Sequence, residues 1–277
     1  MLWRSGLALI LTAVAAVAEP LSFVGQHPLA SDLPGFGGLS AIEMRSGTSA
    51  LVLSDRGMSF ALTLDRDAQR VTAEPVPVAW ENRDSEGLAW ASNRLYVSYE
   101  GPAEVSTASG RALPRAPNYW IFPGNRGFEA LAGAPDGTLY AIPERGPARS
   151  DPIPVFRYLA GRWTTLTHLP PPKGFLPVGA DIGPDGELYL LLRSFSPLGF
   201  RSRIIRLDPE DPESERTVLL TTRPGQFDNL EGLAIWQSDS GATCLTMVSD
   251  DNFRSLQRTE LVEYALTETL EGGATCN

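Results

Sequence analysis

The fold is decided by a unit that reads Leu230-Glu231-Gly232-Leu233-Ala234-Ile235 and then, after a polar turn, Cys244-Leu245-Thr246-Met247-Val248-Ser249-Asp250. It combines a small-residue start, a short apolar strand, a turn, and a second apolar strand that ends in charged residues. The same unit occurs four more times, with strand pairs at 37–42 and 51–56, 85–90 and 95–100, 128–133 and 139–144, and 178–183 and 188–193. In two copies the strands are separated by Pro-Asp-Gly, a sequence typical of tight turns.

The period of this unit predicts a β-propeller. When Leu39, Leu88, Leu131, Asp181 and Leu233 are taken as equivalent, successive copies lie 49, 43, 50 and 52 residues apart. This period is close to that of a four-stranded propeller blade. The sequence therefore predicts an all-β single β-propeller of five four-stranded blades. Six blades would require one copy to be split, and a β-sandwich would leave the even spacing unexplained.

Each copy leaves room for two further strands. The expected outer strands occupy 60–64, 70–78, 104–107, 119–122, 155–159, 163–169, 203–207 and 217–221, whereas the fifth copy has only 260–266. An apolar strand at Leu21–Gln26 can supply the missing outer strand and close the ring. We therefore expect one propeller domain over residues 19–277.

Residues 1–18 have the composition of a secretory signal peptide. Arg4 precedes an apolar run from Leu7 to Val17, and Ala16-Val17-Ala18 places small residues before a cleavage point. The run is too short for an ordinary membrane-spanning helix, although an N-terminal membrane anchor is the alternative. We expect cleavage after residue 18, a periplasmic or secreted protein, and no membrane association afterwards.

The composition excludes several classes of protein. Apolar residues make up 43% of the 277 residues and charged residues 20%, as in ordinary globular chains. The formal net charge of -10 disfavours nucleic acid as a partner, because an acidic surface repels phosphate backbones. We expect a monomer whose partner is a small molecule.

The two cysteines fit an exported protein. Cys244 and Cys276 lie 32 positions apart, and an oxidising compartment favours their pairing. A bridge between them would tie the C-terminal tail to a late strand, whereas two free thiols are the alternative.

Strand directions bring charged residues of all copies to one mouth of the ring. The first strand of each blade lines the central channel, and the second runs antiparallel to it, so its end lies beside the start of the first. These positions carry Glu86, Glu129 and Glu231 at strand starts and Asp55, Arg56, Glu100, Glu144, Arg145, Arg193, Asp250, Asp251 and Asn252 at strand ends. Like charges held close are costly unless a cation or the arginines balance them. The sequence thus predicts a ligand site or an internal salt-bridge ring at this mouth.

The residue types at the mouth favour a hard cation. Carboxylate and amide oxygens suit Ca²⁺ or Mg²⁺. The only histidines, His27 and His168, fall outside the repeated motifs, which disfavours a zinc site and a Ser–His–acid triad. The aromatic and basic stretch 194–203 is either a loop over the mouth or a surface connection.

Several motifs together resemble the phytase-like family, also described as esterase-like activity of phytase. They are Asp84-Ser85-Glu86-Gly87-Leu88-Ala89, Phe128-Glu129-Ala130-Leu131, Arg193-Ser194-Phe195, Asn229-Leu230-Glu231-Gly232-Leu233-Ala234 and Ser249-Asp250-Asp251-Asn252-Phe253. The resemblance implies an exported β-propeller and a metal-assisted hydrolysis of phosphate or carboxylic esters. The chain departs from the repeat at Gly38 and Asp181, where the strand-start glutamate is absent, so a ring of acids would be uneven.

Two functional hypotheses remain open. The first is a Ca²⁺-dependent hydrolase, with Glu86, Glu231 and Asp250 as metal ligands and Asp251 and Glu129 as catalytic groups. In this hypothesis Arg56, Arg145, Arg193 and Asn252 bind the substrate, because arginine pairs well with anionic oxygens. The second is a non-catalytic propeller that binds a small anionic ligand or a protein partner, since a fold alone does not decide the function. A purely structural ionic ring is a third reading.

Overall fold

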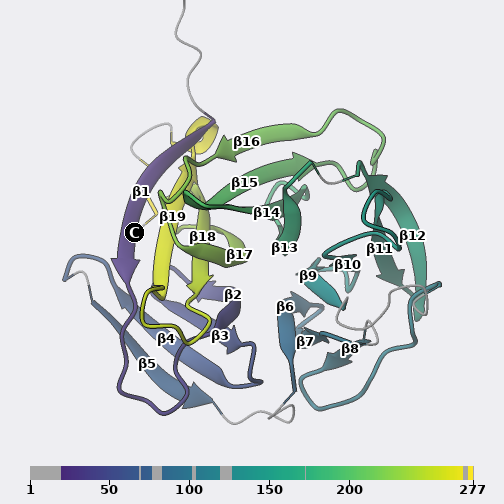
Figure 1. The fold of residues 1–277 in the computed structure, drawn as a ribbon. Helices are drawn as coiled ribbons and strands as arrows, with labels where there is room; N and C mark the ends of the chain where they lie inside the picture. Colours follow the sequence, from purple (N-terminus) through teal and green to yellow (C-terminus); the bar gives the residue numbers. More distant parts are fainter. Residues whose placement is uncertain are drawn as a thin grey trace, which may run out of the picture.

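A computed structural model shows five antiparallel sheets arranged around a central axis (Figure 1). The structure describes residues 20–68, 70–76, 83–101, 104–118, 127–171, 173–270 and 274–276. The predicted signal segment 1–18 and the predicted strand 119–122 lie outside these residues. The five-bladed propeller is confirmed, and the five separate sheets exclude the six-bladed alternative.

Each blade runs outward from the axis in the order of its strands. Blade 1 contains β2 (Leu39–Ser46), β3 (Ser49–Ser54), β4 (Ser59–Asp65) and β5 (Arg70–Val76). Blade 2 contains β6 (Ser85–Ala91), β7 (Arg94–Tyr99) and β8 (Glu104–Thr107). Blade 3 contains β9 (Phe128–Gly133), β10 (Leu139–Pro143), β11 (Ile153–Leu159) and β12 (Arg162–Leu169). Blade 4 contains β13 (Leu176–Ile182), β14 (Leu188–Ser196), β15 (Gly199–Leu207) and β16 (Thr217–Thr221).

The N-terminal strand completes the last blade, as predicted. Blade 5 consists of β17 (Asn229–Gln237), β18 (Thr243–Asp250), β19 (Glu260–Leu266) and, outermost, β1 (Leu21–Pro28), which pairs antiparallel with β19. A short 3-10 turn, η2 (Thr267–Thr269), follows β19. No helix in the described part of the chain has the length and hydropathy needed to cross a membrane.

The apolar core lies between neighbouring blades. The largest cluster packs Tyr189 and Leu191 of blade 4 against Leu233 and Met247 of blade 5. Four further clusters fill the other blade interfaces in the same way. Because every blade buries both of its faces, its strands are apolar on both sides, which explains the continuous apolar runs of the sequence.

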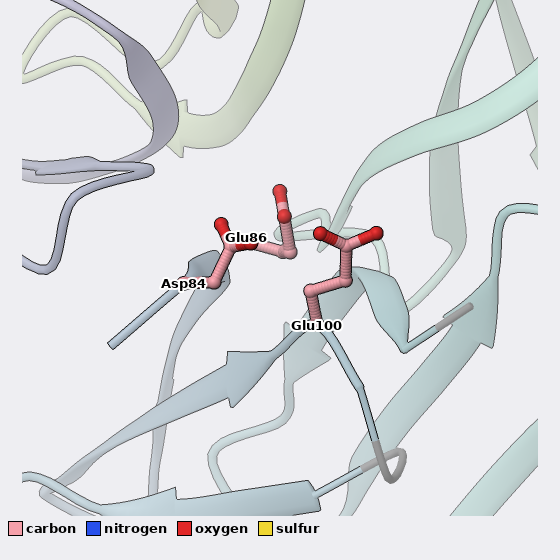
Figure 2. A group of neighbouring side chains, drawn as sticks. All are labelled: Asp84, Glu86 and Glu100. Atoms are coloured by element: carbon pink, nitrogen blue, oxygen red, sulfur yellow. The ribbon is translucent and has the colours of Figure 1, made fainter. Parts of the chain in front are cut away.

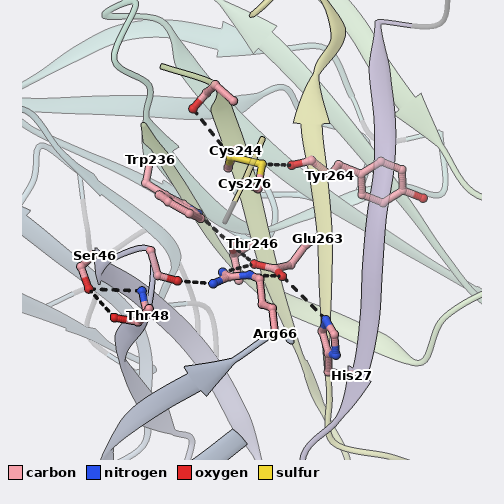
Figure 3. A network of polar contacts seen from close by, with 12 residues as sticks. His27, Ser46, Thr48, Arg66, Trp236, Cys244, Thr246, Glu263, Tyr264 and Cys276 are labelled. Atoms are coloured by element: carbon pink, nitrogen blue, oxygen red, sulfur yellow. Dashed lines mark hydrogen bonds and ion pairs between the residues drawn. A yellow bond between two sulfur atoms is a disulfide. The ribbon is translucent and has the colours of Figure 1, made fainter. Parts of the chain in front are cut away.

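The interface between blades 5 and 1 also contains a buried ion pair (Figure 3). Arg66, which follows β4, donates from Nε and Nη2 to the two carboxylate oxygens of Glu263 on β19 at 2.8 and 2.6 Å. The Arg66 guanidinium also donates to the Gly47 carbonyl and lies 5.5 Å from the ring centre of Trp236. Glu263 accepts a further bond from Thr246 Oγ1 at 3.1 Å. The last blade is thereby held to the first by charge as well as by apolar packing.

The predicted disulfide is present. Cys244 on β18 is bonded to Cys276, and both residues are buried in a small cluster with Trp236. The bridge fixes the C-terminal tail to blade 5, as expected for a chain that folds in an oxidising compartment.

Candidate active site

The strand-start glutamates owe their position to β-bulges in the innermost strands. The pairing of β17 with β18 shifts register between Leu230 and Gly232, which leaves Glu231 as the extra residue. The same shift occurs around Glu129 in β9 and between Ser85 and Leu88 in β6, the stretch that contains Glu86. A bulge bends the strand and re-aims the side chain of its extra residue. The three glutamates therefore share one structural position.

The register corrects the sequence alignment of the other two copies. Their bulges lie between Leu39 and Ala41 in β2 and between Pro177 and Gly179 in β13. Ser40 and Val178 thus occupy the glutamate position, not Gly38 and Asp181. The ring of acids is uneven, as predicted. The two positions without a glutamate are Ser40 and Val178, which the repeat pattern did not identify.

The channel below the glutamates is almost completely filled. The space enclosed by the five innermost strands has a volume of about 10 Å³. Glycines allow this close approach: a Cβ added at Gly179 would lie 2.3 Å from the Glu231 carbonyl, and one at Gly232 would lie 2.9 Å from the backbone of Ala41. Glu86 and Glu129 border this small space, which is too small for a ligand to occupy.

Eight carboxyl groups gather at this end of the propeller, and we call them the acidic mouth. They are Asp55, Asp84, Glu86, Glu100, Glu129, Glu144, Glu231 and Asp250, which interact electrostatically with one another. Three of them, Asp84, Glu86 and Glu100, each place one carboxylate oxygen within 4.8 Å of the other two (Figure 2). Hard oxygens at this separation suit a divalent cation such as Ca²⁺.

Burial and mutual repulsion raise the pKa values of these acids. Burial, reinforced by Glu129 and Glu231, raises the pKa of Glu86 to about 10. Burial and then repulsion from Glu144 and Glu231 raise the pKa of Glu129 well above its ordinary value. Perturbed carboxyls in a depression mark a functional-site candidate, because a proton or a cation has to neutralise them.

Arg193 is a basic residue that lies among the carboxyl groups of the acidic mouth. It pairs with Glu231, donates to Asn229 Oδ1 at 2.9 Å, and places Nη2 3.9 Å from Glu144 Oε1. Burial alone would lower the pKa of Arg193, but the carboxylates of Glu231, Glu129 and Glu144 together raise it. This residue therefore remains a cation among the acids.

The predicted metal ligands are only partly brought together. Glu86 lies with Asp84 and Glu100, whereas Glu231 is engaged by Arg193 and by Asn229 Nδ2 at 2.8 Å. Asp250 accepts from the backbone N–H of Asn252 at 2.6 Å, and burial followed by repulsion from Glu231 raises its pKa to about 7. Among the described residues, Glu231 and Asp250 are therefore not part of the carboxylate group that contains Glu86.

The loop after β18 is built around Asp251. Its Oδ1 accepts from the backbone N–H groups of Gly38 and Phe253 at 2.9 and 3.0 Å, and its Oδ2 accepts from Thr259 Oγ1 at 2.9 Å. These bonds give Asp251 a structural role, since they occupy both oxygens that a general base would use. Asn252 and Phe253 follow in the left-handed region, with φ of 48° and 51°.

The remaining predicted arginines differ in their surroundings. Arg145 Nε donates to Glu144 at 3.1 Å and lies beside the acidic mouth. Arg56 instead stacks on Phe253, with its guanidinium carbon 3.5 Å from the ring centre. Arg145 is thus placed to meet a ligand, whereas Arg56 packs on the loop after β18.

An open cleft of about 1300 Å³ adjoins the acidic mouth, and we call it the arginine cleft. Its charged and amide lining includes Glu144, Arg145, Arg149, Arg193, Arg254, Asn229 and Asn252. Its walls are the β14–β15 hairpin, with Phe195 and Phe200, and the loop after β18, with Phe253 and Leu256. One concave surface therefore contains three of the predicted ligand-binding residues, Arg145, Arg193 and Asn252.

Sequence reasoning missed the residues that loops bring into the site. Asp84 precedes β6 and completes the carboxylate group, while Arg149 and Arg254 lie in connections between strands. Asp84 belongs to the same motif as Glu86, which was the available signal. Nothing in the repeat pattern indicates Arg149 or Arg254.

Stability should depend on pH because of these acids. Burial, followed by the effect of Asp84, raises the pKa of Glu100 to about 7, like that of Asp250. Between the ordinary carboxyl pKa of about 4 and pH 7 the folded chain then binds more protons than the unfolded chain. The free energy of unfolding should therefore fall as pH rises through this window. Urea unfolding at pH 5 and pH 8 measures this difference in stability. Glu100→Gln should make the difference smaller. Identical unfolding midpoints at both pH values would contradict the prediction.

Comparisons with known proteins agree with the fold. An α-L-arabinofuranosidase of Podospora anserina, solved with cellotriose, superimposes with a TM-score of 0.51 at 12% identity over 86% of this chain and 93% of that one. A glutaminyl cyclase of Myxococcus xanthus gives 0.49 at 14% identity, covering 88% and 95%. A calcium-binding regucalcin of Agrobacterium tumefaciens gives 0.48 at 12% identity, also covering 88% and 95%. At 12% identity, the likeness to the arabinofuranosidase concerns the fold alone.

No curated protein matches the sequence. The family model described as "Phytase-like: Esterase-like activity of phytase" matches residues 34–253, which include the acidic mouth and the loop after β18 as far as Phe253. The chain therefore belongs to the phytase-like family of β-propellers.

Proposed function

We propose that this protein is an exported, cation-dependent hydrolase of phosphate or carboxylic esters, with its site where the acidic mouth meets the arginine cleft. The observation that carries the proposal is the group Asp84, Glu86 and Glu100, whose carboxylate oxygens lie within 4.8 Å of one another beside an arginine-lined cleft. Family membership and the disulfide support it.

A divalent cation fits the carboxylate group. Three acidic oxygens without a histidine or cysteine among them favour Ca²⁺ or Mg²⁺ over zinc. Burial, followed by Glu129 and Glu231, raises the pKa of Glu86, and a bound cation would offset the repulsion among these acids. A bound cation would lower the pKa of water and polarise an ester oxygen.

The protein groups around this position supply binding and proton transfer. Arg145 and Arg193 border the cleft, where they can hold the anionic oxygens of an ester. Glu129 lies next to both Glu86 and Arg193. Burial, followed by Glu144 and Glu231, raises the pKa of Glu129 well above its ordinary value. A carboxyl with a raised pKa suits general acid–base catalysis, so we assign proton transfer to Glu129 in preference to Asp251.

The test is calorimetric titration of residues 19–277 with Ca²⁺ after removal of metals. Saturable binding is expected, and Asp84→Asn or Glu86→Gln should weaken it by at least about tenfold, since each removes one of a small number of charged ligands. Asp239→Asn, an exposed acid at the other end of the propeller, is the control.

Hydrolysis is then assayed with 4-nitrophenyl phosphate and 4-nitrophenyl acetate. The rate should disappear in EDTA and return with Ca²⁺. Absence of Ca²⁺ binding, or turnover that EDTA leaves unchanged, would contradict the cation-dependent mechanism. Absence of turnover in the presence of tight ligand binding would favour the non-catalytic binding propeller.

A further inference from the structure

The arginine cleft contains positive charge that the acidic mouth does not balance. Arg149 and Arg254 line the cleft, and both side chains are exposed. Within the described residues neither makes an ion pair or side-chain hydrogen bond, whereas Arg145 and Arg193 both contact Glu144. Glu144 is the acid in the lining. On a chain of net charge -10, this cluster creates a local attraction for anions.

The same cleft exposes large apolar side chains. Phe195 lies at the tip of the β14–β15 hairpin with 71% of its surface exposed, 4.9 Å from the ring of Phe200. Leu256, on the loop after β18 that forms the other wall, is 96% exposed. Exposed apolar groups gathered at a concave site usually mark ligand contacts.

Charge and apolar surface together define a class of ligand. A compact inorganic anion would use the arginines and leave Phe195 and Leu256 in water. An uncharged apolar ligand would leave Arg149 and Arg254 without a counter-charge. An organic anion that joins a charged group to an aromatic or alkyl portion can contact the arginines and the apolar side chains at the same time. The cleft volume of about 1300 Å³ accommodates such a molecule.

We infer that the arginine cleft binds an amphipathic organic anion, with its charged group at Arg149 and Arg254 and its apolar portion against Phe195 and Leu256. The inference deepens the proposed function and rests on it for the identity of the reacting ester. In that framework, the apolar portion is the part of the substrate that does not react.

The experiment measures binding without catalysis. Two probes carry the same charged group: 2-naphthylmethylphosphonate has an aromatic portion and methylphosphonate has almost none. Neither contains an ester bond. Calorimetric titration of residues 19–277 is carried out in EDTA, so that cation binding and turnover do not contribute. The naphthyl probe should bind at least about tenfold more tightly, because the aromatic group removes apolar surface from water.

Variants separate the two contributions. Phe195→Ser should weaken the naphthyl probe at least about fivefold and leave methylphosphonate unchanged. The double variant Arg149→Gln, Arg254→Gln should weaken both probes. The matched controls are Leu159→Ser and Arg162→Gln, two exposed residues at the β11–β12 turn on the opposite end of the propeller. All five positions are exposed, so the thermal midpoints should remain that of the wild type.

Equal affinity for the two probes would overturn the inference, as would loss of binding in the controls as large as that in the cleft variants. Binding to anionic phospholipid vesicles without binding of the soluble naphthyl probe would also overturn it, in favour of membrane docking. If Ca²⁺ binding and hydrolysis fail while the naphthyl probe binds as expected, the proposed function fails and the cleft assignment stands.

Discussion

Arg66→Met should lower the free energy of unfolding by about 3–5 kcal/mol at pH 7, the cost of leaving one partner of a buried ion pair uncompensated. Glu263 is only 1% exposed, and Arg66 donates to both of its carboxylate oxygens. The other contacts of Glu263 are a bond from the neutral Thr246 hydroxyl at 3.1 Å and His27 Nε2, which lies 3.8 Å from Oε2. Both are weaker than the two short bonds from the guanidinium. Because the pair joins the last blade to the first, the loss acts on ring closure.

Chemical unfolding monitored by tryptophan fluorescence measures this effect. Arg70→Met is the matched control: its partner Asp65 lies 3.8 Å away, both side chains are largely exposed, and such pairs contribute about 0–1 kcal/mol. Adding Glu263→Gln to Arg66→Met should recover part of the loss, because the unpaired charge is then removed. Equal stabilities of Arg66→Met and Arg70→Met would show that ring closure depends on strand pairing alone.

Glu129→Gln should abolish most of the hydrolytic activity while making the protein more stable at pH 7. Removal of a general acid–base group costs about 10²–10⁴ in rate. The pKa of Glu129 is raised by burial and by Glu144 and Glu231. Above the ordinary carboxyl pKa, this side chain therefore costs the folded chain free energy that it does not cost the unfolded chain. Glutamine keeps the shape without this cost, and active sites commonly trade stability for function in this way.

Rates with 4-nitrophenyl esters and urea midpoints at pH 4 and pH 7 test both parts. The gain in stability should be present at pH 7 and vanish near pH 4, where the carboxyl is protonated in both states. Glu74→Gln, an exposed residue on β5, should change neither quantity. Full activity of Glu129→Gln would remove this residue from the mechanism, and a lower midpoint at pH 7 would show that its carboxylate is stabilised by its surroundings.

The sequence determined the architecture because the strands and turns of each blade are encoded in short, contiguous stretches of the chain. Alternating turns and apolar strands of nearly constant length require five equivalent sheets. The strand at 21–26 has no partner in its own copy, and the last copy lacks one outer strand, so the two complete each other. Antiparallel pairing then places Glu86, Glu129, Glu231 and Asp250 at one end of the ring whatever the details of packing.

Two further buried acids, Asp181 and Glu43, have partners that the repeat pattern does not predict. Asp181 was grouped with the strand-start positions, but it accepts from the backbone N–H of Ile235 in the next blade at 2.6 Å. Glu43 likewise accepts from Trp90 N–H in the neighbouring blade at 3.0 Å. Burial raises the pKa of Asp181 to about 7. Both acids lie toward the end of the channel opposite the acidic mouth, because each follows the bulge on its strand.

The tertiary structure alone decided which charged residues share a site. A one-residue bulge turns a side chain from one face of a strand to the other, and its position depends on how neighbouring blades approach. Arg149 and Arg254 come from loops whose paths are set only when the ring closes, so their meeting with Phe195 has no signature in the spacing of the repeats. The sequence by itself therefore determined the five blades, the disulfide partners and the charged mouth, to which the group Asp84, Glu86 and Glu100 belongs within a single blade. The arginine cleft, by contrast, depends on loops of different blades that come together only in the folded ring.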